Sequence, residues 1–183
     1  MKCVLAAVCA LLCLVALGGC ETYNSLDLPE IKQLKLDMIA AAPSIRDIEV
    51  TYGDLSKHPA IIVRGYKITD EDALSIVKRA RNLFSDEGFY DKLFKTMGTI
   101  PKEEFRAGYR PAPPISITMM DSAWVPETFS GHKYSFDSRY FVTEENGAEG
   151  DVVDGYSTWW GGRVSDNDEN CKAFSMEEIL AAD

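Results

Sequence analysis

The side chains that could carry out covalent chemistry are few. The chain has two histidines, His58 and His132, and beyond its first twenty residues it has one cysteine, Cys171. A pair of Cys171 and His132 is chemically sensible, because a histidine can take the proton of a thiol and leave a nucleophilic thiolate. No local motif of a hydrolase, a metalloprotease or a phosphate-binding loop accompanies them. We keep an enzyme that uses Cys171 and His132 as an alternative, and expect a buried, inert cysteine instead.

Oxygen-bearing side chains recur near the end of the chain with the spacing of a calcium loop. Such loops use oxygens at positions 1, 3 and 5, a backbone carbonyl at 7 and a bidentate glutamate at 12. Position 6, where glycine normally allows the sharp bend, is Cys171, and a strand precedes the loop where a helix is usual. We expect a solvated acidic loop, with a calcium-stabilised module as the alternative; its ligands would be Asp166, Asp168, Asn170, Lys172 and Glu177.

Three aromatic residues precede a pair of glycines. Tyr156, Trp159 and Trp160 lie in a segment that reads as a strand, where successive side chains point to opposite faces. Trp159 and Trp160 therefore cannot both lie in the core of a regular strand, and one of them should be exposed or cover an edge. Flat aromatic faces suit sugars and protein side chains, so these residues are candidates for binding an envelope protein or a glycan. The alternative is that they pack under a helix or a loop.

The first twenty residues have the features of an export signal. Lys2 is followed by an uncharged apolar run over residues 3–19, which is short for a membrane span and suits the apolar region of a secretory signal. The run ends in Leu17-Gly18-Gly19-Cys20. This sequence resembles the lipobox of bacterial lipoproteins, in which a branched apolar residue and two small residues precede the cysteine that receives lipid.

The resemblance to bacterial lipoproteins covers the leader and Cys20 only, but it implies a location. Residues 1–19 would be removed, and Cys20 would carry diacylglycerol on its sulfur and an acyl chain on its new amino group. Two or more chains give a stable membrane anchor, at about 0.8 kcal/mol per buried methylene. Residue 21 is glutamate rather than aspartate. In a Gram-negative cell this favours the outer membrane, with the domain in the periplasm.

The composition of the part after residue 19 excludes some functions. Of the 19 basic residues only Lys2 lies in the leader, so 18 basic and 29 acidic residues remain, for a net charge of −11. Nucleic acid is an improbable partner for so acidic a chain, because its phosphates require a basic surface. Cys171 is the one thiol left once Cys20 carries lipid, so the domain has no internal disulfide and must be held together by its hydrophobic core.

Apolar periodicity and turn residues predict an α+β domain. We expect a mainly antiparallel sheet with helices packed on one face, because the helices and strands do not alternate regularly. Thr69 with Asp72, and Ser175 with Glu178, read as capping boxes at two helix starts. The expected helices span 27–42, 69–84 and 89–97 with a short one after Ser175, and the expected strands span 47–51, 60–68, 115–120 and an antiparallel hairpin of 133–142 with 151–160.

These observations divide the chain and suggest what it does. We expect a signal peptide over residues 1–19, a lipidated tether over 20–26 and a single soluble domain over 27–183. The leading hypothesis is a non-enzymatic binding or assembly module of the bacterial cell envelope, anchored to the membrane by lipid on Cys20. The ligand or partner does not follow from the sequence.

Overall fold

The computed structural model describes residues 22–54, 56–98, 113–121, 132–142, 152–164 and 171–182. Its helices are α2 (Pro29–Ala41), α3 (Asp70–Phe84), α4 (Glu87–Thr96) and α6 (Met176–Ala181). The main sheet contains β1 (Tyr23–Ser25), β2 (Ile45–Gly53), β3 (Pro59–Gly65), β4 (Ile115–Asp121), β5 (His132–Ser138), β8 (Trp159–Arg163) and β9 (Lys172–Ala173). A separate small ribbon is made by β6 (Phe141–Val142) and β7 (Val152–Val153).

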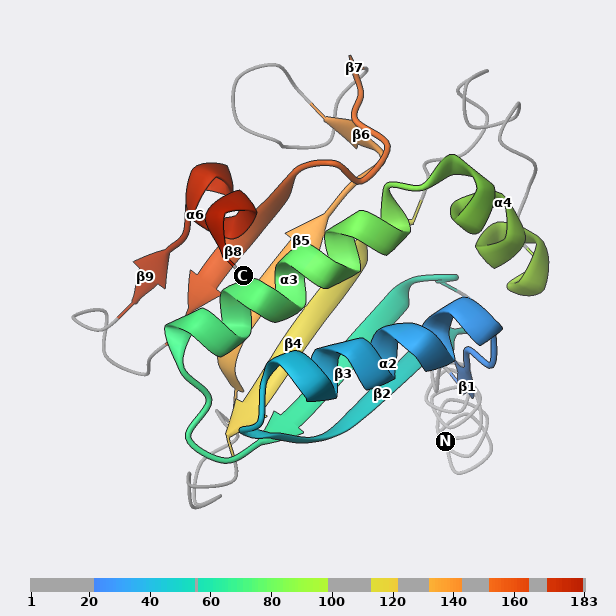
Figure 1. The fold of residues 1–183 in the computed structure, drawn as a ribbon. Helices are drawn as coiled ribbons and strands as arrows, with labels where there is room; N and C mark the ends of the chain where they lie inside the picture. The colour runs from blue at the N-terminus through green and yellow to red at the C-terminus, as the bar shows by residue number, and fades with distance from the viewer. Residues whose placement is uncertain are drawn as a thin grey trace, which may run out of the picture.

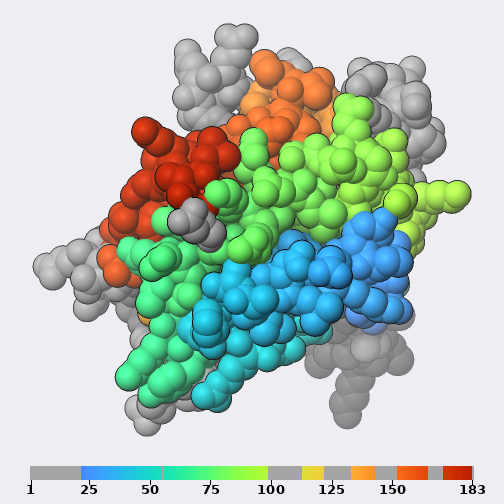
Figure 2. Space-filling view, in the orientation of Figure 1, coloured from blue at the N-terminus to red at the C-terminus, as the bar shows by residue number. Residues whose placement is uncertain are grey.

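The main sheet has seven strands in the order β1-β2-β3-β4-β5-β8-β9. Every neighbouring pair is antiparallel except β3 and β4, which are parallel. α2, α3 and α6 lie across one face of this sheet (Figure 1), and their side chains cover that face in the space-filling view (Figure 2). The predicted α+β class, with a mainly antiparallel sheet and helices on one face, is therefore confirmed. Among the described residues no helix is long and apolar enough to cross a membrane.

The parallel pair determines where functional residues can gather. Two parallel strands need a crossover connection, and here α3 and α4 supply it between β3 and β4. The carboxyl ends of both strands therefore lie at the same end of the sheet, where α3 begins. In open sheets with parallel strands, ligands bind preferentially outside such carboxyl ends. The register pairs Gly65 with Asp121, the last residues of β3 and β4.

α3 is the central helix of the core, as its apolar periodicity predicts. Its N-cap Thr69 accepts a hydrogen bond from Asp72 N, and the Asp72 carboxylate accepts one from Thr69 N, so the predicted capping box is present. Five apolar side chains of α3 are fully buried, and Leu83 is partly buried against them. The five are Ala73, Ile76, Val77, Ala80 and Phe84.

The predicted hairpin is also present, although it is interrupted. β5 pairs with β8, and β6 pairs with β7 further along, both antiparallel. Between them Tyr140 and Tyr156 turn into the core, where Tyr140 shares a hydrogen bond of 3.0 Å with Tyr90 of α4. The Tyr156 hydroxyl donates to Pro113 O at 2.8 Å. These aromatic contacts join the hairpin to α4 and to the start of β4.

The structure differs from the sequence prediction most clearly at the end of β3 and before α2. The strand predicted over 60–68 ends at Gly65, and the next residues form a turn into α3. Residues 21–26 were predicted to be a tether, but Tyr23–Ser25 form the edge strand β1 against β2, and Leu26 is fully buried. A strand of three residues has too little periodicity to be recognised in a sequence, because the partner strand, and not its own pattern, stabilises it.

Candidate functional site

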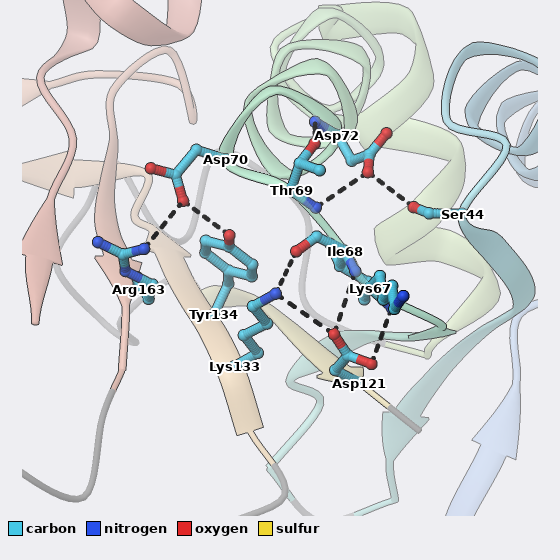
Figure 3. Close-up of polar contacts among 10 residues, drawn as sticks. All are labelled: Ser44, Lys67, Ile68, Thr69, Asp70, Asp72, Asp121, Lys133, Tyr134 and Arg163. Carbon is cyan, nitrogen blue, oxygen red and sulfur yellow. Dashed lines mark hydrogen bonds and ion pairs between the residues drawn. The ribbon is translucent and has the colours of Figure 1, made fainter. Parts of the chain in front are cut away.

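The best-organised polar cluster lies where β3 and β4 end and α3 begins (Figure 3). At its centre are residues 65–69, which we call the β3–α3 turn. Gly65 opens the turn against the α2–β2 connection, and Tyr66 N donates a hydrogen bond of 2.9 Å to Ser44 O. A Cβ on Gly65 would come within 2.7 Å of that same Ser44 oxygen. The glycine therefore permits the backbones to approach closely enough for the hydrogen bond.

Asp121, the last residue of β4, holds the middle of the β3–α3 turn. Its carboxylate accepts hydrogen bonds from Lys67 N at 3.0 Å and from Ile68 N at 3.1 Å, and Lys133 Nζ lies 3.3 Å away. Lys133 Nζ also donates to Ile68 O. Asp121 is only 8% exposed. Hydrogen bonds to a buried charge are stronger than neutral ones, at about 1.5–3 kcal/mol each, so this carboxylate fixes the path of the turn.

The end of the β3–α3 turn is fixed in the same way. The Asp72 carboxylate that completes the capping box also accepts a hydrogen bond of 2.7 Å from Ser44 Oγ. Ile68 is fully buried in the core. The turn is thus attached to β4, to β5 through Lys133 and to the α2–β2 connection through Ser44, and it has little freedom to move.

This rigid turn presents an aromatic ring to solvent. Tyr66 is 44% exposed. Arg46 Cζ lies 5.5 Å from the ring centroid and Lys67 Nζ lies 5.4 Å from it, within the range of cation–π attraction. Among the described residues neither cation forms an ion pair with a carboxylate. The backbone of Lys67 has a φ of +57°, in the left-handed region that residues other than glycine rarely adopt. Such backbone strain concentrates at functional sites.

A second polar group lies beside the turn, on the first residue of α3. The Asp70 carboxylate accepts a hydrogen bond of 2.7 Å from the Tyr134 hydroxyl, and it lies 3.8 Å from Arg163 and 3.7 Å from Lys172. Burial, followed by the hydrogen bond to Asp70, raises the pKa of Tyr134 above its ordinary value. The hydroxyl therefore stays protonated and donates. These contacts join α3 to β5, β8 and β9.

The geometry of the cluster suits binding better than catalysis. The Asp121 and Asp72 carboxylates already accept hydrogen bonds from the backbone of the turn, so their role is to hold it. The exposed groups are one aromatic ring and two cations. Tyrosine and arginine are enriched among the residues that dominate binding energy at protein interfaces, and a rigid display lowers the entropy cost of binding.

The aromatic residues predicted as a binding surface do not form one together. Tyr156 and Trp159 are 0% and 1% exposed and lie in the core. Trp160 pairs with Asp137 on the opposite face of the sheet and is partly exposed. The predicted alternation of Trp159 and Trp160 is thus correct, but it leaves only one of the three rings accessible. Tyr156 is drawn inward by Tyr90 and Tyr140, with which it makes edge-to-face contacts.

The predicted calcium ligands are only partly within the described residues. Asp166, Asp168 and Asn170 lie outside them, so the calcium loop stays a prediction. Lys172 lies in β9, where its carbonyl oxygen approaches Gly162 so closely that a Cβ there would come within 1.8 Å. Glu177 is exposed in the first turn of α6. In the parts of the chain that are described, no group of three or more His, Cys, Asp or Glu side chains could hold a metal ion.

Cys171 and His132 lie at the same end of the sheet, one before β9 and the other at the start of β5. Cys171 immediately precedes β9 and is exposed, contrary to the expected buried cysteine, whereas His132 begins β5. β8 lies between β5 and β9 in the sheet. Two strand spacings separate the backbones by about 10 Å. The nucleophile–base hypothesis therefore stays a prediction.

Sequence reasoning missed the residues of the β3–α3 turn. Tyr66 and Ile68 are strand-forming residue types that alternate with the polar Lys67, so residues 66–68 read as the end of a strand. Asp121, whose carboxylate holds the turn after β3, lies more than fifty residues away in the chain. Two features of the sequence indicate a turn at this point, namely Gly65 and the capping box at Thr69. Cys20, the predicted lipid site, lies outside the described residues.

No protein-family model, curated protein or solved structure matches this chain. The site is therefore interpreted from its own geometry.

Proposed function

We propose that this chain is a binding module of the bacterial cell envelope, anchored to a membrane by lipid on Cys20, and that it binds its partner through the β3–α3 turn. One observation carries the proposal. A buried carboxylate, Asp121, holds a turn that exposes Tyr66 beside two cations, Arg46 and Lys67, which form no ion pair with a carboxylate among the described residues.

The anchor is supported by the leader and by the order of elements after it. Leu17-Gly18-Gly19-Cys20 has the residue types of a lipobox, and an apolar run precedes it. Thr22 and Tyr23, two and three residues after the proposed lipid site, already contact the rest of the domain. A binding module attached in this way acts on partners that come within reach of the membrane surface. In a Gram-negative cell, the proposal includes the periplasmic face of the outer membrane.

The binding role is supported by the contrast between the β3–α3 turn and its surroundings. The part of the chain after residue 19 has a net charge of −11, yet the exposed ring at this turn is flanked by two positive charges. A local positive group on an acidic protein favours an acidic or carboxylate-bearing surface on the partner, because electrostatic complementarity selects partners. The hydrogen bond from Lys67 N to Asp121 holds Lys67 in its left-handed backbone conformation. Residues held in such a strained conformation cluster at functional sites.

The anchor is tested by labelling living bacteria with a clickable fatty acid. The wild-type chain should carry the label and sediment with membranes. Cys20→Ala should carry no label and should accumulate as uncut precursor or leave the membrane, since no thiol remains to accept lipid. Cys171→Ser is the matched control and should keep the label. Label retained by Cys20→Ala, or absent from the wild type, would contradict the anchor.

The binding surface is tested with a photoreactive amino acid at position 66 in the full lipidated chain, expressed in the bacterium that makes it. A discrete cross-linked species should form from position 66. The same amino acid at Asn82, an exposed position of α3 away from the turn, should not give that species. Substituting Arg46→Ala and Lys67→Ala should weaken the cross-link from position 66. Equal cross-linking from both positions, or none from 66, would argue against this surface.

A further inference from the structure

We infer that the anchored domain stands end-on on the bilayer, with Tyr23 and Lys57 against the lipid headgroups and the β3–α3 turn pointing away. This inference rests on the proposed lipid on Cys20, and it names the surface that contacts the membrane. The partner of this surface is the phospholipid leaflet that holds the acyl chains.

The first step is the length of chain between the lipid and the fold. Tyr23 is three residues after Cys20, and three residues span at most about 11 Å. Tyr23 itself is fixed, because β1 pairs it with Gly53. Asn24 Nδ2 also donates to Asp54 at 2.7 Å, and Leu26 is buried. The lipid is therefore held close to one corner of the sheet, without a long tether.

The second step is the identity of that corner. Tyr23 pairs with the last residue of β2, so it lies at the end of the sheet where β2 turns into β3. The β3–α3 turn follows the other end of β3. β3 has seven residues from Pro59 to Gly65, and a strand of this length spans about 20 Å. Figure 1 shows β1 and the end of β2 on one side of the molecule and the start of α3 on the other.

The third step is the chemistry of the near end. Tyr23 is 64% exposed, the largest exposure among the large apolar side chains that the structure describes. Lys57 follows β2 at this end of the sheet, and its Nζ lies 5.7 Å from the centroid of the ring of Tyr52, the penultimate residue of β2. Tyrosine and lysine are residue types that anchor proteins at the membrane interface, where the ring sits among headgroups and the ammonium reaches toward lipid phosphates.

The near end exposes the carboxylate of Asp54, which accepts hydrogen bonds from Thr22 and Asn24, whereas the neighbouring faces expose several carboxylates. The part of β2 beyond β1 exposes Asp47 and Glu49, and the outer face of α2 exposes Asp37. Anionic lipids repel carboxylates at the membrane surface. α2 also exposes Leu36 and Ile39, so the competing arrangement would lay α2 on the bilayer. That arrangement predicts a different set of residues close to lipid.

The experiment uses the full lipidated chain in vesicles that contain lipids with a nitroxide on the headgroup. Cys171→Ser removes the exposed thiol, and a fluorophore is attached in turn to Ser56→Cys at the near end, Glu71→Cys on the first turn of α3 and Asp37→Cys on α2. All three positions are exposed. Quenching at position 56 should exceed that at 71 and 37 by about threefold or more, because position 71 lies about a strand length, 20 Å, further from the headgroups.

A variant with a longer linker tests whether the orientation depends on the short connection between Cys20 and Tyr23. About 20 Gly and Ser residues inserted between Glu21 and Thr22 span roughly 25 Å on average, which should remove the difference between positions 56 and 71 while the protein stays on the vesicles. Equal quenching without the linker, or strongest quenching at 37, would overturn the end-on orientation. Failure of Cys20 to carry lipid, measured on the same preparation by mass, would instead overturn the anchor itself.

Discussion

At the scale of single residues, Asp121 has the largest consequence for the β3–α3 turn. It is buried, and it accepts two backbone hydrogen bonds while facing Lys133. Removing one partner of a buried charged pair costs more than the pair contributes, because the other group is left without compensation. The conformation of the β3–α3 turn should therefore depend strongly on the Asp121 side chain.

We predict that Asp121→Asn lowers the free energy of unfolding by about 3 kcal/mol, because an amide can accept from one of the two N–H groups but turns its own N–H₂ toward the other. Asp47→Asn is the matched control. Asp47 is exposed and pairs with Arg64 at 2.6 Å, so its loss should cost less than about 1 kcal/mol. Urea unfolding of both variants measures the difference. Equal effects would mean that the turn does not depend on Asp121.

Buried tyrosines should make the fold sensitive to alkaline pH. Burial raises the pKa of Tyr156 well above its ordinary value, and burial with the hydrogen bond to Asp70 raises that of Tyr134. Both groups stay protonated in the fold, whereas the unfolded chain loses these protons above about pH 10. Stability from this source is complete below the unfolded pKa and falls as pH rises above it, by up to 1.4 kcal/mol per pH unit and group.

Tyr156→Phe separates this effect from packing. The variant should lose about 1 kcal/mol at neutral pH, because Pro113 O loses its donor, but its stability should fall less steeply than that of the wild type above pH 10. Guanidinium unfolding at several pH values between 7 and 11 measures both quantities. Parallel curves for the two proteins in the alkaline range would exclude Tyr156 as a source of the pH dependence.

At the scale of elements, α3 was predictable because its information is local. Its apolar face repeats with helical period, and Thr69 with Asp72 marks its start within four residues. The end of β3 was not predictable, because Tyr66 and Ile68 are strand-forming residue types and the turn is held by residues remote in the chain, among them Asp121. β1 was missed for the same reason. Its three residues form a strand only where β2 supplies hydrogen-bond partners.

The buried face of α3 gives a direct test of the core. Val77 is fully buried, so Val77→Asp should cost several kcal/mol or leave the domain unfolded, because a carboxylate without a partner would be buried. Asn82→Asp adds the same charge to an exposed position of the same helix and should change stability by less than about 0.5 kcal/mol. Thermal melts followed by circular dichroism compare the two. An unchanged melting temperature for Val77→Asp would mean that Val77 does not lie on the buried face of α3.

At the scale of the whole molecule, β1 combines a structural role with a connection to the proposed anchor. It covers part of the edge of β2, whose N–H and C=O groups would otherwise be open to another chain, and it attaches the domain to the proposed anchor. Edge strands without cover promote association between copies. The short connection to Cys20 and the protection of the edge therefore depend on the same three residues.

The last prediction compares two soluble chains, one beginning at Thr22 and one beginning at Leu26. The shorter chain keeps the buried Leu26 but lacks β1 and the contacts of Thr22 and Asn24 with Asp54. It should lose about 1 kcal/mol, or roughly 3 °C in Tm for a domain of this size, since each backbone hydrogen bond contributes about 1 kcal/mol against the cost of ordering its residue. It should also associate with rising concentration through the uncovered edge of β2, which light scattering after size-exclusion chromatography measures. If residues 22–25 were only a tether, both chains would melt at the same temperature and remain monomeric, and the end-on orientation would lose the fixed corner on which it depends.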